Sequence, residues 1–277
     1  MSLTANIKVR SLPVMILSLG FLMGSCGENK KEAENEETQA TQEATTTQAS
    51  TEAGPNELSE KEKEDGWELL FDGETTEGWR GYLKEDFPSQ GWTIEDGALK
   101  VIGSGAGEAG GGGDIIYDEK FKDFELSLEW KVSEGGNSGI FYLAQEIEGE
   151  PIYTSAPEMQ ILDNERHPDA RLGRDGNRMA GSLYDLIPAK PQNAKPVGQW
   201  NKVNIIVYRG TVVHFQNGEQ VVEYHLWTDD WKNMVADSKF KDWENFINAG
   251  GEDRTGYIGL QDHGDDVWFR NIKIKRM

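Results

Sequence analysis

The amino-acid sequence predicts an all-β protein, folded as a two-sheet antiparallel sandwich with one short helical insertion. The 277 residues include 32 glycines and nine tryptophans, a composition that suits many turns and strands with buried aromatic side chains. In several segments apolar and polar residues alternate with a period of two, the pattern of a strand with one buried face. Strands at short, regular spacing are typical of a sandwich of two antiparallel sheets.

The first 25 residues are predicted to be a signal peptide. Lys8 and Arg10 precede a short apolar stretch, Val14–Met23, which is too short to span a membrane. Cys26, the only cysteine, follows it as in a bacterial lipobox, where the cysteine is lipidated. With Gly27 after the cysteine, we expect an exported outer-membrane lipoprotein facing the periplasm or the cell surface. Ordinary secretion with a chance cysteine is the alternative.

Residues 26–65 are predicted to be the lipidated cysteine and a disordered acidic tether. Gly27–Asp65 contains no aromatic residue and holds 12 acidic and four basic residues, so it cannot bury enough apolar surface to fold. The predicted domain, residues 66–277, is also acidic, which argues against nucleic acid and anionic lipid as partners. We expect membrane association only through the lipid anchor.

The first predicted strands are defined by one turn and one long alternating segment. Asp96-Gly97 lies between two short apolar stretches and predicts a two-residue hairpin. Gly103–Gly113 is rich in glycine, but no GxGxxG motif there opens onto a helix. We therefore expect a flexible surface loop and no organic cofactor. Phe124–Val132 alternates strictly and predicts a half-buried strand.

The following segments predict further strands and one helix. Val203–Val207 alternates, and Asn217-Gly218 joins Thr211–Gln216 to Glu219–His225 in a second hairpin. In Ser238–Asn248 aromatic and aliphatic residues recur at spacings of three and four, which predicts one amphipathic helix.

The C-terminal region predicts two strands and an irregularity. Tyr257–Leu260 and Val267–Lys275 flank a Gly-Asp-Asp turn. In the last strand the apolar phase slips by one residue, so we expect a bulge near Arg270–Asn271.

Seven motifs in one order resemble the 3-keto-disaccharide hydrolase family. They are Leu70–Trp79, Phe124–Val132, Asn137–Tyr142, Pro157–Asn164, Gly181–Ala189, Gly198–Asn201 and Thr255–Lys275. The resemblance spans about residue 66 to the C-terminus and implies a concanavalin-like jelly roll that acts on 3-keto sugars. The chain departs from the family at Leu143, where an arginine is frequent, and this bears on substrate preference.

Polar residues on two neighbouring strands predict the site. In Glu158–Leu162, alternation sends Met159 and Ile161 into the core, and Glu158 and Gln160 to the outer face. Gln261 and His263 share one parity at the end of another strand. With the resemblance, we expect Glu158, Gln160 and His263 around a divalent cation or the C3 oxygen of the substrate. Carboxylate, amide and imidazole ligands leave Mg²⁺, Mn²⁺, Ca²⁺ and Zn²⁺ open.

The remaining candidates have supporting roles. Glu158 and His263 are the main catalytic candidates, with Asp163 and Tyr184 as further acid or base groups. The expected substrate contacts are Asn137, Gln261, Arg270, His167 and Trp268. His214 and His225 lie in the second hairpin, where a structural role is expected.

The family resemblance implies net hydrolysis of 3-keto glycosides or disaccharides. A C3 ketone acidifies the C2 proton, so a base can form an enediolate that expels the aglycone, and water then adds. Two alternatives stay open. One is a lectin-like carbohydrate-binding module. The other is a retaining glycosidase acting on unoxidised glycans, because Glu158, Gln160 and Asp163 are spaced much like the E-x-D-x-x-E strand of retaining endoglucanases. The neutral Gln160 makes that alternative the weaker one.

Overall fold

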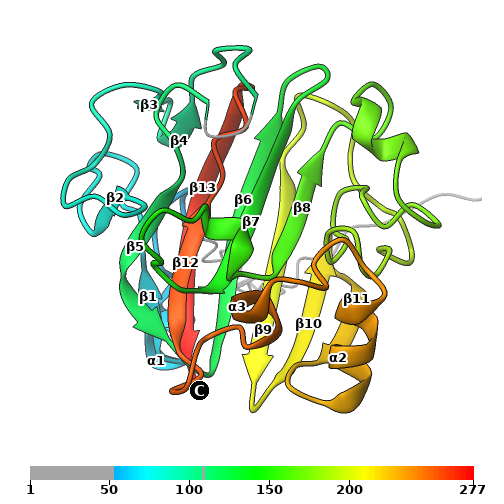
Figure 1. Ribbon diagram of the computed structural model, residues 1–277. Helices are drawn as coiled ribbons and strands as arrows, with labels where there is room; N and C mark the ends of the chain where they lie inside the picture. The colour runs from blue at the N-terminus through cyan, green and yellow to red at the C-terminus, as the bar shows by residue number, and fades with distance from the viewer. Residues whose placement is uncertain (1–52, 108–109) are drawn as a thin grey trace, which may run out of the picture. The chain divides into compact units, whose positions relative to one another are not determined.

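Two antiparallel sheets packed face to face form the folded part of the chain in the computed structural model, which describes residues 53–107 and 110–277 (Figure 1). The larger sheet has eight strands in the order β11-β10-β9-β6-β13-β4-β3, with β1 also paired to β13. The smaller sheet has five strands in the order β2-β5-β12-β7-β8 and stands in front of the larger one in Figure 1. The predicted fold class is confirmed.

The strands of the larger sheet are β1 (Trp67–Leu69), β3 (Trp92–Glu95), β4 (Ala98–Val101), β6 (Phe124–Val132), β9 (Asn201–Tyr208), β10 (Thr211–Gln216), β11 (Glu219–His225) and β13 (Val267–Arg276). Those of the smaller sheet are β2 (Trp79–Gly81), β5 (Ile115–Phe121), β7 (Asn137–Ala144), β8 (Glu158–Leu162) and β12 (Gly256–Leu260). The helices are α1 (Glu60–Glu64), α2 (Asp229–Ala236) and α3 (Glu244–Ile247), with 3₁₀ turns η1 (Ile152–Thr154) and η2 (Pro168–Arg171).

The main core lies between the two sheets and follows the predicted alternation. In β6 the residues Phe124, Leu128 and Trp130 are almost fully buried in this core. In β8 the core residues are Met159 and Ile161, each with no exposed surface. Alternation therefore turns the other face of each strand away from the core.

The two predicted hairpin turns are present. Asp96 and Gly97 have φ angles of 51° and 73°, and Asn217 and Gly218 have φ angles of 50° and 86°. Two consecutive positive φ angles are the geometry that Asn-Gly and Asp-Gly favour in two-residue hairpins. The predictions of both hairpin turns are therefore confirmed.

The predicted bulge in β13 is also confirmed, and it anchors the N-terminal segment. The pairing of β13 with β6 shifts between Arg270 and Lys273, where Asn271 adopts a φ of 53°. The side chain of Asn271 accepts a hydrogen bond from the Asn56 backbone N–H (2.6 Å), and the Asn271 N–H donates to the Asn56 side chain (2.8 Å). Glu62 of α1 pairs with Lys273.

The predicted tether is therefore wrong at its C-terminal end. Residues 53–65 belong to the folded unit, because the bulge offers backbone and side-chain partners that composition does not reveal. Residues 1–52, including the predicted signal peptide and Cys26, lie outside the described residues. None of the described helices is long and apolar enough to cross a membrane.

The predicted helix at Ser238–Asn248 is wrong in extent, and α2 was not predicted. Only Glu244–Ile247 is helical there. The aromatic spacing instead reflects side chains that stack on one another, with ring centroids of Phe240 and Phe246 4.4 Å apart. The unpredicted helix α2 begins after Thr228, whose side chain accepts a hydrogen bond from the Trp231 N–H (3.2 Å).

The C-terminal end of the glycine-rich segment, Gly112 and Gly113, is anchored by one buried carboxylate. Asp262 Oδ2 accepts hydrogen bonds from the N–H groups of Gly112 (2.9 Å) and Gly113 (3.1 Å).

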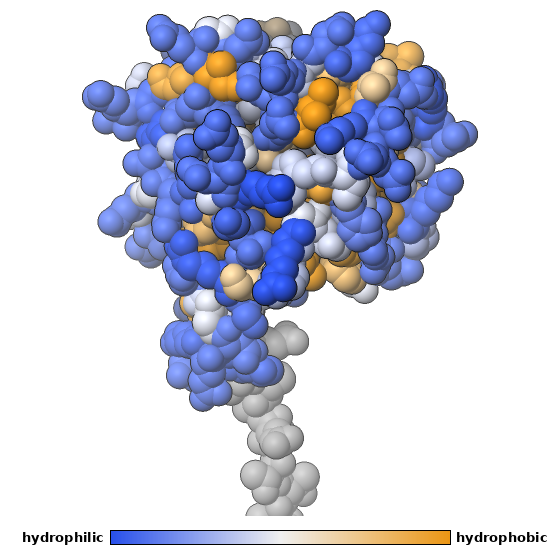
Figure 2. Space-filling view, turned by 60° about the horizontal axis from the view of Figure 1, so that its bottom comes forward, coloured by the Kyte–Doolittle hydropathy of each residue, from blue (hydrophilic) through white to orange (hydrophobic). Residues whose placement is uncertain are grey.

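Most of the molecular face in Figure 2 is hydrophilic, with apolar residues in small, separate patches.

Candidate active site

A pocket of about 300 Å³ lies on the outward face of the five-stranded sheet. Its polar residues come from β7, β8 and the segment around the end of β12, and its aromatic wall comes from η1 and the segments around Tyr184 and α3. The lining residues are Asn137, Tyr153, Ala156, Glu158, Gln160, Tyr184, Lys239, Phe240, Trp243, Phe246, Gln261 and His263. Six of the residues predicted from the sequence thus meet in one pocket.

Strand alternation places Glu158 at the pocket floor, and a glycine makes room for it. Gly139 of β7 pairs with Gln160 of β8. A Cβ atom at Gly139 would collide with the Glu158 carboxylate. Glycine at this position therefore leaves the space that the Glu158 carboxylate occupies, and its backbone angles do not call for glycine.

Glu158 and Gln160 are buried although both are polar. Their exposed fractions are 7% and 2%. When its amide nitrogen faces Glu158, Gln160 donates hydrogen bonds to Glu158 Oε1 (2.9 Å) and to the Ser138 carbonyl oxygen (3.1 Å). The amide therefore orients the carboxylate toward the pocket.

Lys239 is a pocket residue that the sequence reasoning missed. Although the residue is exposed overall, its ammonium lies 4.2 Å from the centroid of the Tyr184 ring, and burial of that group lowers the pKa of Lys239. Tyr184 donates a hydrogen bond to Asp169 Oδ2 (2.9 Å), and burial raises its pKa. A lysine within an aromatic-rich segment was the available signal.

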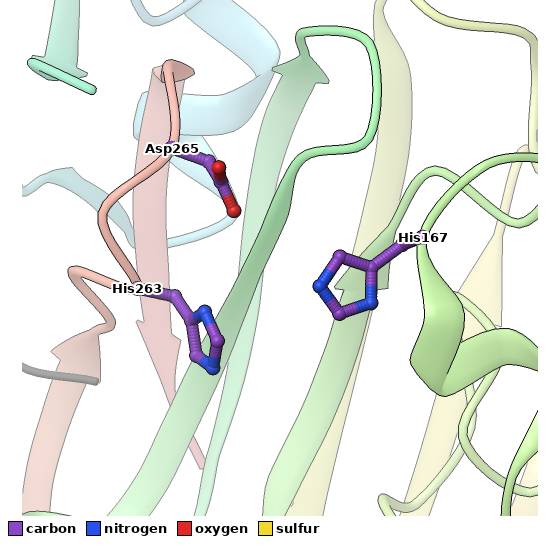
Figure 3. A group of neighbouring side chains, drawn as sticks. All are labelled: His167, His263 and Asp265. Atoms are coloured by element: carbon purple, nitrogen blue, oxygen red, sulfur yellow. The ribbon is translucent and has the colours of Figure 1, made fainter. Parts of the chain in front are cut away.

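His263 connects the pocket to a second group of side chains (Figure 3). Ligand atoms of His167, His263 and Asp265 all lie within 4.8 Å of one another. Asp265 Oδ2 accepts a hydrogen bond from the Asn137 N–H (3.1 Å). Burial, and secondarily the charge of His263, lowers the pKa of His167, whereas burial raises the pKa of Asp265. Asp265 lies in the Gly-Asp-Asp segment, which the sequence marked only as a turn.

Asp163 supports a loop rather than lining the pocket. Its carboxylate accepts hydrogen bonds from the backbone N–H groups of Gly135 (2.8 Å), Glu165 (3.1 Å) and Arg166 (3.3 Å). Burial raises the pKa of Asp163, but these donors outweigh it and the pKa is lowered. The structure thus places Asp163 outside the pocket lining, and its contacts support a structural role in this loop.

Arg270 and Trp268 also lie away from the pocket. Both point outward from β13 in the larger sheet, because Val267 and Phe269 occupy the core side. The pocket is on the outward face of the other sheet, so the core separates them. Arg270 pairs with Glu129 (2.8 Å). The chain changes sheets between β12 and β13, which strand parity alone does not reveal.

The burial and contacts of His214 agree with the structural role predicted for it, whereas His225 lies at the surface. His214 is fully buried, and its Nε2 lies 2.8 Å from the hydroxyl of Tyr142, which also contacts Tyr224 (2.7 Å). His225 is exposed and contacts Thr211 (3.1 Å).

Comparison with known proteins links this chain to one family. A family model described as a 3-keto-α-glucoside-1,2-lyase-like domain matches residues 66–275. A 3-keto-disaccharide hydrolase of Bacteroides thetaiotaomicron is 53% identical, over 94% of this chain and 95% of the relative.

Solved structures from Parabacteroides distasonis share the fold. One, named only provisionally as a glycosyl hydrolase, has a TM-score of 0.70 and 28% identity, covering 81% of this chain and all of its own. A second, named in the same way, has a TM-score of 0.59 and 25% identity, covering 76% of this chain and 99% of its own.

Proposed function

The chain belongs to the 3-keto-α-glucoside-1,2-lyase-like family, and on that premise we propose that it cleaves 3-keto glycosides or 3-keto disaccharides by elimination across C1 and C2, followed by hydration. One observation carries the mechanistic part of the proposal. Among the described residues that line the pocket, Glu158 is the one carboxylate, and it is buried beside Gln160. A single oriented base fits proton abstraction next to a ketone.

In the proposed reaction Glu158 removes the proton from C2. The electrons of the C2–H bond form an enediolate with negative charge on the C3 oxygen, and the bond from C1 to the aglycone oxygen then breaks. Water adds at C1 and a proton returns to C2, so the net reaction is hydrolysis. We assign the ammonium of Lys239 and the amide of Gln261 as the donors to the C3 oxygen, because both amide hydrogens of Gln160 are engaged by Glu158 and the Ser138 carbonyl oxygen.

The aglycone oxygen needs a proton as it leaves. We assign this donation to His263, which lines the same pocket. Tyr184 is less suited, because burial raises its pKa and its hydroxyl already donates to Asp169. We assign Tyr184 to holding the Lys239 ammonium.

Double displacement by a retaining glycosidase is less well supported. That mechanism needs two carboxyl groups about 5–5.5 Å apart at the scissile bond. In the described part of the chain, Glu158 has no second carboxylate beside it in the pocket lining, and Asp163 is engaged by three backbone N–H groups.

The test is to compare 3-keto-trehalose and 3-keto-lactose with their unoxidised parents. We expect turnover of the 3-keto compounds alone and, in heavy water, deuterium at C2 of the released sugar. Cleavage of the plain disaccharides without C2 exchange would favour double displacement. Binding of sugars without any turnover would favour a lectin-like module.

We also propose that the protein is exported and anchored in the outer membrane through lipidated Cys26. The support is the short apolar stretch that ends at the only cysteine of the chain. Mass spectrometry of the mature N-terminus should find acylated Cys26. An unmodified cysteine, or cleavage at another residue, would contradict the proposal.

A further inference from the structure

We propose that His167, His263 and Asp265 form a divalent metal site at the edge of the pocket. The ligand atoms of these three side chains lie within 4.8 Å of one another, and all three residues are half-buried. The site itself rests on geometry. Only its part in catalysis rests on the proposed function.

The three side chains come from two segments, the turn between β12 and β13 for His263 and Asp265 and the start of η2 for His167, and local contacts hold two of them. Asp265 Oδ2 accepts a hydrogen bond from the backbone N–H of Asn137 in β7 (3.1 Å). His167 precedes η2, and its Nδ1 accepts the hydrogen bond that caps this turn, from Asp169 N–H (3.2 Å). The other nitrogen of the His167 ring points toward His263 and Asp265 in Figure 3. The side chains therefore converge on one small volume.

Asp265, rather than the neighbouring Asp262, is the carboxylate of this site. Asp262 is fully buried, and its two oxygens accept hydrogen bonds from the N–H groups of Gly112, Gly113 and Gly264. These bonds commit Asp262 to the glycine-rich loop. Asp265 is only half-buried and faces the two imidazoles.

Two imidazoles and one carboxylate select the class of cation. Imidazole nitrogen suits Zn²⁺ and other first-row transition ions, whereas Mg²⁺ and Ca²⁺ prefer sites built of oxygen atoms. We therefore assign the site to Zn²⁺ or a similar transition dication. The set differs from Glu158, Gln160 and His263, the ligands expected from the sequence, and only His263 is common to both.

Metal binding has one local cost and one consequence for the pocket. If Nε2 of His167 binds the cation, the ring proton moves to Nδ1, and Nδ1 can no longer accept the hydrogen bond from Asp169 N–H. The free energy of coordination outweighs the loss of this hydrogen bond. A cation held by one nitrogen of His263 fixes the ring proton on the other. That tautomer has the N–H group that donation to a leaving oxygen requires.

The test is calorimetric titration of the EDTA-treated, dialysed full chain with ZnCl₂, and with MgCl₂ and CaCl₂ for comparison. We expect one Zn²⁺ per chain and binding of Mg²⁺ and Ca²⁺ at least about 100-fold weaker. The variants Asp265→Asn, His167→Asn and His263→Ala should each weaken Zn²⁺ binding at least about tenfold. Asn retains a hydrogen-bond acceptor at residues 265 and 167, so folding should persist.

His225→Ala is the matched control, since His225 is an exposed histidine on β11, the edge strand of the larger sheet. It should leave Zn²⁺ binding unchanged. Failure of the wild-type chain to bind Zn²⁺, or equal affinity in wild type and Asp265→Asn, would overturn the site. Zn²⁺ binding by a chain that does not turn over 3-keto sugars would overturn the proposed function and leave the site standing.

Discussion

The outward faces of the two sheets use aromatic and charged residues in different ways. On the larger sheet, the Trp268 ring lies between the ammonium groups of Lys100 (4.7 Å) and Lys131 (4.4 Å). Trp200, which precedes β9, contacts Lys131 (5.0 Å) and Arg270 (4.0 Å). Cationic side chains thus lie over the faces of these aromatic rings, which could otherwise stack on a sugar.

On the smaller sheet, segments from elsewhere in the chain cover the strands and enclose a pocket. Its wall contains Trp243 and Phe246, and the cationic groups of Lys239 and Arg178 both lie over the ring of Tyr184. The polar residues of β7 and β8 form its floor. Strand alternation thus sends polar residues outward on both faces, but only covering segments turn one face into a site.

The largest effect should come from the carboxylate that distinguishes the smaller face. Glu158→Gln keeps the shape of the side chain but removes the base, so kcat on 3-keto-trehalose should fall by about 10³-fold. Steady-state kinetics measure this, with circular dichroism to confirm the fold. Wild-type turnover in a folded Glu158→Gln variant would show that the base lies elsewhere.

A smaller but still large effect should follow from displacing that carboxylate without removing it. Gly139→Ala places a methyl group against Glu158, so kcat should fall by about 10²-fold. Gly111→Ala is the matched control, because a Cβ there meets its neighbours at ordinary distances of 3.7 and 3.8 Å. Equal activity of the two variants would mean that the position of Glu158 does not matter.

The sequence predicted most of the smaller face but could not separate it from the larger one. Parity correctly turned Glu158 and Gln160 outward, and turn chemistry gave both hairpins. Parity also turned Trp268 and Arg270 outward, onto a different sheet, because no local pattern reports where the chain changes sheets. Lys239 lies in the pocket on a loop whose path depends on stacking between Phe240 and Phe246, aromatic rings whose spacing in the sequence resembles that of a helix.

The core between the two faces offers a test of stability. Burial lowers the pKa of His214 to about 4, compared with the ordinary value of 6.5. Above pH 6.5 both folded and unfolded states are neutral at this residue. Between pH 6.5 and 4 only the unfolded state gains the proton, so stability is lost as the pH falls. We expect this residue to cost about 3 kcal/mol of unfolding free energy at pH 4.

The measurement is urea unfolding at pH 7 and pH 4 for wild type and for His214→Asn. The variant should be less stable than wild type at pH 7 because it loses a buried contact. Between pH 7 and pH 4, however, its free energy of unfolding should fall by about 3 kcal/mol less than that of wild type. His225→Asn should behave as wild type, since this residue is exposed. If the free energy of unfolding changed with pH in the same way for wild type and His214→Asn, the imidazole of His214 would not be neutral and buried in the folded state.

The smallest effect is expected on the larger face, and it tests the comparison most directly. Trp268 donates a hydrogen bond to Glu95 Oε1 (2.7 Å) and stacks between two lysines, so Trp268→Ala should cost about 1 kcal/mol of stability and leave kcat/KM within about twofold. Trp243→Ala removes a ring of equal size from the pocket wall and should lower kcat/KM about tenfold or more. If both variants lost activity equally, the larger face would also take part in substrate binding, as the sequence pattern by itself suggested. If only Trp243→Ala did, the cover over the smaller sheet would be what defines the site.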